Sequence, residues 1–122
     1  MLLPLSFSAR VITGDGRGRT LGVPTLNLDL RDVPEELEIG VFACRAVIGG
    51  ATFPATMHHG PRPTFGAIAS CEVHLIDVSL PSPPEHVEVE VVEFLRGIAT
   101  YPSAEALQVQ MAEDIRRAKE IA

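Results

Sequence analysis

The stretch GVFACRAVIGGATFPATMH, residues 40–58, decides the fold class of this chain. Its two halves are strand-like runs, and Gly49-Gly50 separates them. A glycine pair between two such runs is the usual signal for a tight β-hairpin turn, because both central residues of the turn need positive φ. We therefore predict paired strands over residues 40–48 and 51–58.

Four more segments outside this hairpin have the pattern of strands. The clearest is residues 25–30, where polar and apolar residues alternate. This period of two places the leucines on one face and Thr25 and Asn27 side by side on the other. In a later segment the same period puts Glu72 and His74 on one face. The four predicted strands cover residues 7–12, 25–30, 70–78 and 87–95.

The C-terminal segment changes to a helical period. Ser103 follows a proline and can cap the N-terminus of a helix. Glu113 and Arg117 stand at the spacing of a stabilising i,i+4 ion pair. Six strands followed by one helix predict a mainly β protein, a small antiparallel barrel with a C-terminal α-helix packed on it. The apolar stripe expected to face the barrel comprises Leu107, Met111, Ile115 and Ala118.

Length and composition limit the class of protein. The chain has 122 residues, which fits one domain over residues 1–122. The net charge of −6 argues against a nucleic-acid partner, which would favour a basic surface. The sequence has neither a signal-peptide pattern nor an apolar run long enough to cross a membrane, so we expect a cytoplasmic protein without a membrane partner. Cys44 and Cys71 lack metal-site spacing and are expected to be buried free thiols.

A segment rich in glycine and arginine precedes the strand at residues 25–30. Glycine lets backbone amides approach a ligand closely, and arginine matches phosphate oxygens. The hydroxyl of Thr25 and the amide of Asn27 offer neutral oxygens of the kind that Mg²⁺ accepts. The segment has neither the Gly-Lys-Ser/Thr end of a Walker loop nor the following helix of a dinucleotide fingerprint. We predict a phosphate and magnesium site formed by Gly14, Gly16, Arg17, Gly18, Arg19, Thr25 and Asn27.

Three other groups of side chains have both a functional and a structural interpretation. From its pattern alone, Glu72 fits an ordinary solvated carboxylate of a strand, and a general base is the alternative. Arg96 can pair with Glu93, face solvent or reach a ligand, and the sequence leaves these alternatives open. His58 and His59 are adjacent and point to opposite faces of their strand, which argues against a transition-metal site.

The order and spacing of these motifs resembles the riboflavin kinase (flavokinase) family, including the C-terminal module of bacterial bifunctional FAD synthetases. The resemblance extends over essentially the whole chain. It rests on the segments 14–22, 24–27, 40–43, 60–66, 72–77 and 94–96, and on the terminal helix with Asp114.

The resemblance implies a six-stranded Greek-key barrel that transfers the γ-phosphate of ATP to the 5′-hydroxyl of riboflavin and so makes FMN. It assigns Mg²⁺ and nucleotide phosphate to Thr25 and Asn27, the general base to Glu72, and a position near phosphate to Arg19. The glycine segment becomes a flap over the nucleotide, and Arg96 becomes a candidate flavin contact. The implied partners are riboflavin, ATP and a fused or separate FAD synthetase (adenylyltransferase) domain.

The chain departs from the family pattern at several positions. His58 and His59 stand where the family usually has Asn and a hydrophobic residue, and Leu26 replaces an alanine. Residues 83–86 read Pro-Pro-Glu-His instead of Asp-Leu-Tyr-Gly, and Ile98 and Thr100 replace Glu and Lys. These changes leave a second hypothesis, a degenerate kinase-like barrel that binds flavin or nucleotide without catalysis.

Overall fold

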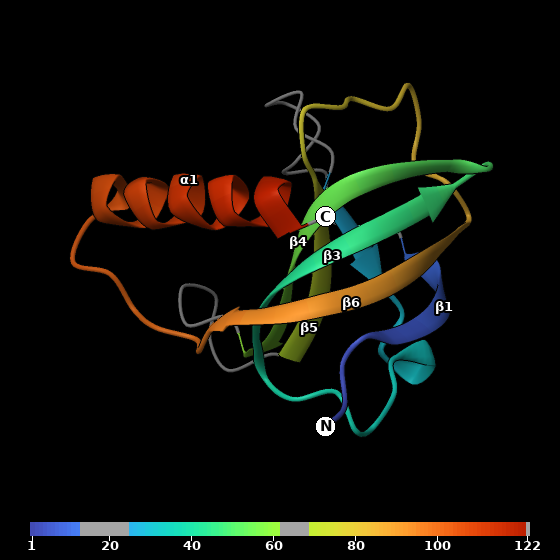
Figure 1. Ribbon diagram of the computed structural model, residues 1–122, viewed down its shortest axis with the longest axis horizontal. Coiled ribbons are helices and arrows are strands. Elements are labelled where there is room, and N and C mark those ends of the chain that lie inside the picture. The colour runs from blue at the N-terminus through green and yellow to red at the C-terminus, as the bar shows by residue number, and fades with distance from the viewer. Residues whose placement is uncertain (13–24, 62–68, 122) are drawn as a thin grey trace.

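The predicted hairpin is present and forms two neighbouring strands of the sheet (Figure 1). The computed structural model describes residues 1–12, 25–61 and 69–121. β3 (Gly40–Ile48) and β4 (Ala51–Pro61) pair over the whole length of β3. Gly49 and Gly50 adopt φ values of 56° and 82°, as both central residues of a type I′ turn must. The glycine pair therefore sets the turn, and the prediction is confirmed.

The remaining strands close the sheet into a barrel. Within the described residues, six antiparallel strands follow one another in the order β1, β2, β5, β4, β3 and β6, and β6 pairs with β1. β3, β4 and β5 form a meander and β6 returns beside β3, which is a Greek key. The predicted mainly β barrel with a C-terminal helix is confirmed. The other elements are β1 Leu5–Ile12, β2 Thr25–Leu28, η1 (a 3₁₀ helix) Leu30–Asp32, β5 Ala69–Leu75, β6 His86–Arg96 and α1 Ala104–Ile121.

The apolar face of each strand fills the interior of the barrel. Along β2 the side chains alternate, so Leu26 and Leu28 are buried while Thr25 and Asn27 are half-buried on the outside. Polar side chains of the strands are thereby left on the outer surface, which is where a site can form. Cys44 and Cys71 are buried free thiols, as predicted. The largest fully buried side chains include Phe42, Leu28, Met57, Leu75 and Val73.

The helix α1 packs on the outside of the barrel. A second apolar cluster joins Ala118 of the helix to Val41 and Ala43 of β3 and to Leu95 of β6. The hydroxyl of Ser103 accepts a hydrogen bond from the amide of Ala106 at 3.1 Å, so the predicted cap is confirmed. Packing holds the C-terminal half of the helix against the barrel, and the cap stabilises the N-terminus of the helix.

The helix differs from the prediction at two points. Met111 belongs to the predicted apolar stripe but is 42% exposed, because the C-terminal half of α1 lies against the barrel and the N-terminal half extends past it (Figure 1). Glu113 pairs with Arg116 rather than with Arg117, whose guanidinium instead donates to the carbonyl oxygen of Leu95. The helical period predicts the helix correctly, but it does not predict which half of the helix contacts the barrel.

Candidate active site

The outer face of β2 and β5 brings together the side chains predicted to bind metal and to act as the base. Asn27 lies directly opposite Glu72 in the β2–β5 ladder, and Thr25 lies opposite His74. Directly opposed residues of an antiparallel pair have their Cβ atoms about 4.5–5.5 Å apart. Segments more than forty residues apart in sequence thus meet on one surface, as the predicted roles require.

The strand on the other side of β5 extends this polar surface. His58 of β4 faces Glu72, and Thr56 faces His74. Two rows therefore cross the three strands, and Glu72 and His74 occupy their centres. All six of these side chains are half-buried, while the intervening residues point into the core. Partial burial strengthens electrostatic interactions at such a surface relative to bulk water.

His74 contributes no positive charge to this surface at neutral pH. Burial lowers the pKa of its imidazole below the ordinary value, because desolvation disfavours the charged form. A neutral imidazole can donate one hydrogen bond and accept another. His74 therefore offers an uncharged donor and acceptor on the same strand face as the carboxylate of Glu72.

Oxygen donors for Mg²⁺ are available on this face. The hydroxyl of Thr25 and the amide oxygen of Asn27 occupy alternate positions of β2 and so share its outer side. In the part of the chain that the structure describes, no group of three or more His, Cys, Asp or Glu side chains could hold a metal ion. Two neutral oxygens fit a hard cation that takes its other ligands from phosphates and water.

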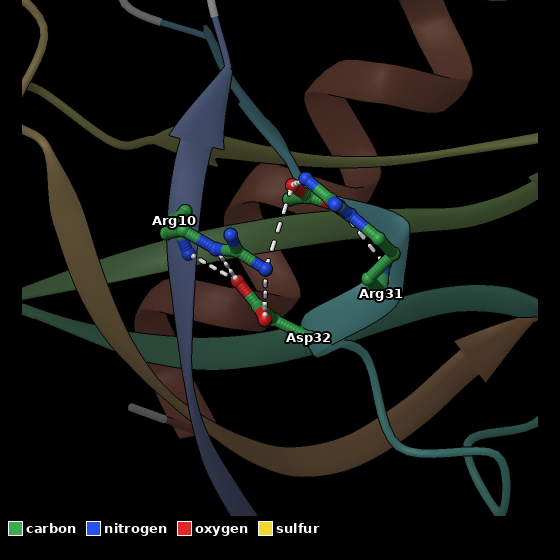
Figure 2. Close-up of polar contacts among 4 residues, drawn as sticks. Arg10, Arg31 and Asp32 are labelled. Carbon is green, nitrogen blue, oxygen red and sulfur yellow. Dashed lines mark hydrogen bonds and ion pairs between the residues drawn. The ribbon is translucent and has the colours of Figure 1, made fainter.

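An ion-pair network that the sequence motifs do not reveal anchors β2 where it ends (Figure 2). Arg10 of β1 donates to both carboxylate oxygens of Asp32 at 2.9 Å, and its own backbone amide donates to the same group. Arg31 donates to Asp29 through its backbone amide and its guanidinium. These bonds lower the pKa of Asp29 to about 2 and that of Asp32 below its usual range. A sequence signal was present, since Asp29 continues the polar face of β2.

Arg96 is engaged by the helix. Its guanidinium donates to both oxygens of Asp114, at 3.1 and 2.8 Å, and stacks on Tyr101. Asp114 is 3% exposed and also accepts from Gln110. Arg96 thus pairs with the buried carboxylate of Asp114 and not with Glu93. A flavin contact of Arg96 stays a prediction.

Several predicted site residues lie outside the described part of the chain. They are Gly14, Gly16, Arg17, Gly18 and Arg19, together with the Arg62–Gly66 motif.

A membrane-spanning helix is not found in the part of the chain that the structure describes.

Comparison with known sequences decides the family. The Flavokinase model, described as riboflavin kinase, matches residues 1–122. The chain belongs to the riboflavin kinase family. It is 34% identical over 119 residues to the bifunctional riboflavin kinase/FMN adenylyltransferase of Escherichia coli K12, and 36% identical over 118 residues to that of Haemophilus influenzae. These alignments cover 96% and 95% of this chain but 38% of either relative.

Solved structures share the riboflavin kinase fold of this chain. A Trypanosoma brucei riboflavin kinase superposes with a TM-score of 0.63 over 98% of this chain and 80% of that one, at 14% identity, which supports the fold alone. A Streptococcus pneumoniae structure titled macrolide-efflux protein superposes with a TM-score of 0.81 at 29% identity. That superposition covers 98% of this chain and 40% of the other. This chain therefore shares its barrel and C-terminal helix with a solved riboflavin kinase.

Proposed function

We propose that this protein transfers the γ-phosphoryl group of ATP to the 5′-hydroxyl of riboflavin, which gives FMN and ADP. Membership of the riboflavin kinase family supports the reaction, and the observation that carries the site is the β2–β5 register, which sets Asn27 opposite Glu72. Phosphoryl transfer depends mainly on positioning and charge stabilisation, and a shared strand face supplies positioning.

Glu72 acts in this proposal as the general base. Its carboxylate accepts the proton of the riboflavin hydroxyl as that oxygen forms its bond to the γ-phosphorus and the bond to the ADP oxygen breaks. One carboxylate within hydrogen-bond reach of the hydroxyl is enough for this step. Half-burial on β5 keeps the group partly desolvated and held by its neighbours.

Thr25 and Asn27 hold the nucleotide end of the site. Their oxygens are the ligands that we assign to Mg²⁺, which when bound neutralises charge on the phosphates of ATP. The glycine segment with Arg17 and Arg19 is proposed to bind the phosphates through backbone amides and guanidinium groups. This assignment rests on the sequence motif, because these residues lie outside the described part of the chain.

The 122 residues are proposed to act as one kinase domain. Because the curated relatives also carry an FMN adenylyltransferase name and are more than twice as long, we propose an FAD-forming adenylyltransferase, fused or separate, as the partner that consumes FMN. A cytoplasmic location stays a prediction. None of the departures from the family pattern replaces Thr25, Asn27 or Glu72, and no comparison favours the non-catalytic alternative.

The test is FMN formation from riboflavin and Mg-ATP, followed by chromatography. The protein is expected to make FMN, and Glu72→Gln is expected to lower kcat by about 100- to 10,000-fold. Glu88→Gln is the matched control, because Glu88 is an exposed carboxylate on the outer face of β6. Binding is checked by the rise in melting temperature with Mg-ATP, which Glu72→Gln should keep. Absence of FMN with the unaltered protein would refute the proposed function, and full activity of Glu72→Gln would remove Glu72 from the role of base.

A further inference from the structure

The proposed base has a histidine neighbour that the family pattern does not predict. His58 lies opposite Glu72 in the β4–β5 ladder, and Asn27 lies opposite Glu72 from the other side. Because β5 is between β2 and β4, the carboxylate is flanked by an amide and an imidazole on the same outer face. All three side chains are half-buried.

We propose that His58 is a positioning residue for Glu72, and this inference rests on the proposed kinase function. The Nε2–H group of His58 donates to one carboxylate oxygen of Glu72, because its Nδ1 atom is buried and makes no hydrogen bond. The other carboxylate oxygen is then left to receive the proton of the hydroxyl. The cross-strand separation of directly opposed residues is within reach of a histidine and a glutamate side chain. A neutral imidazole carries one N–H donor, so the bond does not require a charged histidine.

A hydrogen bond from His58 would hold the side chain of Glu72 in one conformation. A glutamate side chain has three rotatable bonds, and holding it in one conformation has a cost in side-chain entropy that a fixed donor offsets. General-base catalysis depends on the position of the accepting oxygen. His58 is suited to this role because it lies on a continuous strand whose neighbour Met57 is fully buried in the core.

The adjacent histidine is a natural control. Neighbouring residues of a strand point to opposite faces, and Nδ1 of His59 lies 2.9 Å from the carbonyl oxygen of Glu38. His59 therefore has the same side chain and the same strand but does not share the face of Glu72. A substitution there changes β4 without changing the proposed contact.

Steady-state kinetics of matched variants tests the inference. His58→Leu removes the donor and is expected to lower kcat by about 10- to 100-fold, the range for losing a hydrogen bond to a charged group, while KM for Mg-ATP stays within about twofold. His58→Gln places a donor near the Nε2 position and should restore kcat to within about threefold, whereas His58→Asn, whose donor lies near the Nδ1 position, should restore less. His59→Leu should keep kcat. An unchanged kcat in His58→Leu, or no rescue by His58→Gln, would overturn the proposal.

A second measurement does not depend on catalysis or on the fold of a His58 variant. In ¹H–¹⁵N spectra of the imidazole groups, Glu72→Gln is expected to shift the ring signals of His58 and to leave those of His59 in place. Ring signals of His58 that do not move would overturn the positioning role. If the unaltered protein makes no FMN, the proposed function fails, and the imidazole spectra still decide whether the contact exists.

Discussion

At the scale of single residues, the proposed site places the neutral oxygens of Thr25 and Asn27 beside the carboxylate of Glu72. Thr25 and Asn27 have outward side chains because Leu26 and Leu28 are drawn into the core. Their oxygens add no negative charge to the surface that we propose binds the phosphates of ATP. The affinity for Mg-ATP should therefore depend on the individual hydroxyl and amide groups.

Replacing Thr25 by valine tests this dependence with little change in shape. Thr25→Val is expected to raise KM for Mg-ATP about tenfold, which corresponds to about 1.4 kcal/mol. Initial rates at varied Mg-ATP and varied free Mg²⁺ measure the effect. Thr52→Val is the matched control, since Thr52 is an exposed threonine on the outer face of β4. Equal effects of the two substitutions would contradict the assignment of Thr25.

The two cysteines should be chemically inert in the folded protein. Burial raises the pKa of the Cys71 thiol to about 12, and burial also raises the pKa of Cys44 above its ordinary value. The reactive thiolate is therefore scarce at pH 8 in the native state. A disulfide reagent such as DTNB should label both residues rapidly in urea and only slowly without it. Rapid labelling of the native protein would contradict their buried placement.

At the scale of elements, the terminal helix is tied to the barrel by a buried ion pair. Arg96 at the end of β6 meets Asp114 in the middle of α1, on the face that also carries Ala118. Breaking a buried pair costs more than breaking an exposed one, because the remaining charge stays desolvated. The helix should therefore depend strongly on this contact.

Arg96→Met is expected to reduce the free energy of unfolding by about 3 kcal/mol. Arg116→Met removes an arginine that pairs with Glu113 and Glu120 at the exposed surface of the same helix, and it should reduce the stability much less, because solvent screens an exposed pair. Urea unfolding followed by circular dichroism measures both. Similar losses in the two variants would show that burial of the Arg96 pair has no special effect.

How much the sequence predicts differs between local and distant features. Gly49-Gly50 and the alternation of residues 25–30 are local signals. The hairpin agrees with the first, and β2 agrees with the second as far as Leu28, after which residues 30–32 form the 3₁₀ helix η1. The pairing of Asn27 with Glu72 and of Arg96 with Asp114 depends on which distant segments meet, and periodicity carries no such information. For the same reason the exposure of Met111 was not predicted.

At the scale of the whole molecule, the barrel closes through a short seam. β1 and β2 share the registered pairs Val11↔Leu28 and Ile12↔Asn27, and the amide of Asp29 then donates to the carbonyl oxygen of Arg10 at 2.9 Å. The network of Figure 2 continues the seam beyond these bonds. The same contacts therefore close the barrel and position Asn27.

Acid should weaken this seam. The pKa of Asp32 is held below its usual range by Arg10, so the ion pair stabilises the fold fully above the unfolded-state value of about 3.9 and loses its effect as the pH falls below it. Arg10→Gln is therefore expected to lower the melting temperature at pH 7. The difference from the unaltered protein should shrink between pH 4 and pH 2. A difference that stays constant over this range would contradict the role of the pair.

The most direct test of the central claim is to locate the metal–nucleotide complex on the barrel. Paramagnetic Mn²⁺ supplied with ADP should broaden the amide signals of residues 25–27 of β2 and of residues 72–74 of β5, compared with Mg²⁺ and ADP. Signals of residues 6–8 of β1 and 88–90 of β6, on the other half of the barrel, should stay sharp. Mn²⁺ without nucleotide is the control for binding to surface carboxylates. Broadening centred on β1 and β6, or none at β2 and β5, would contradict the account.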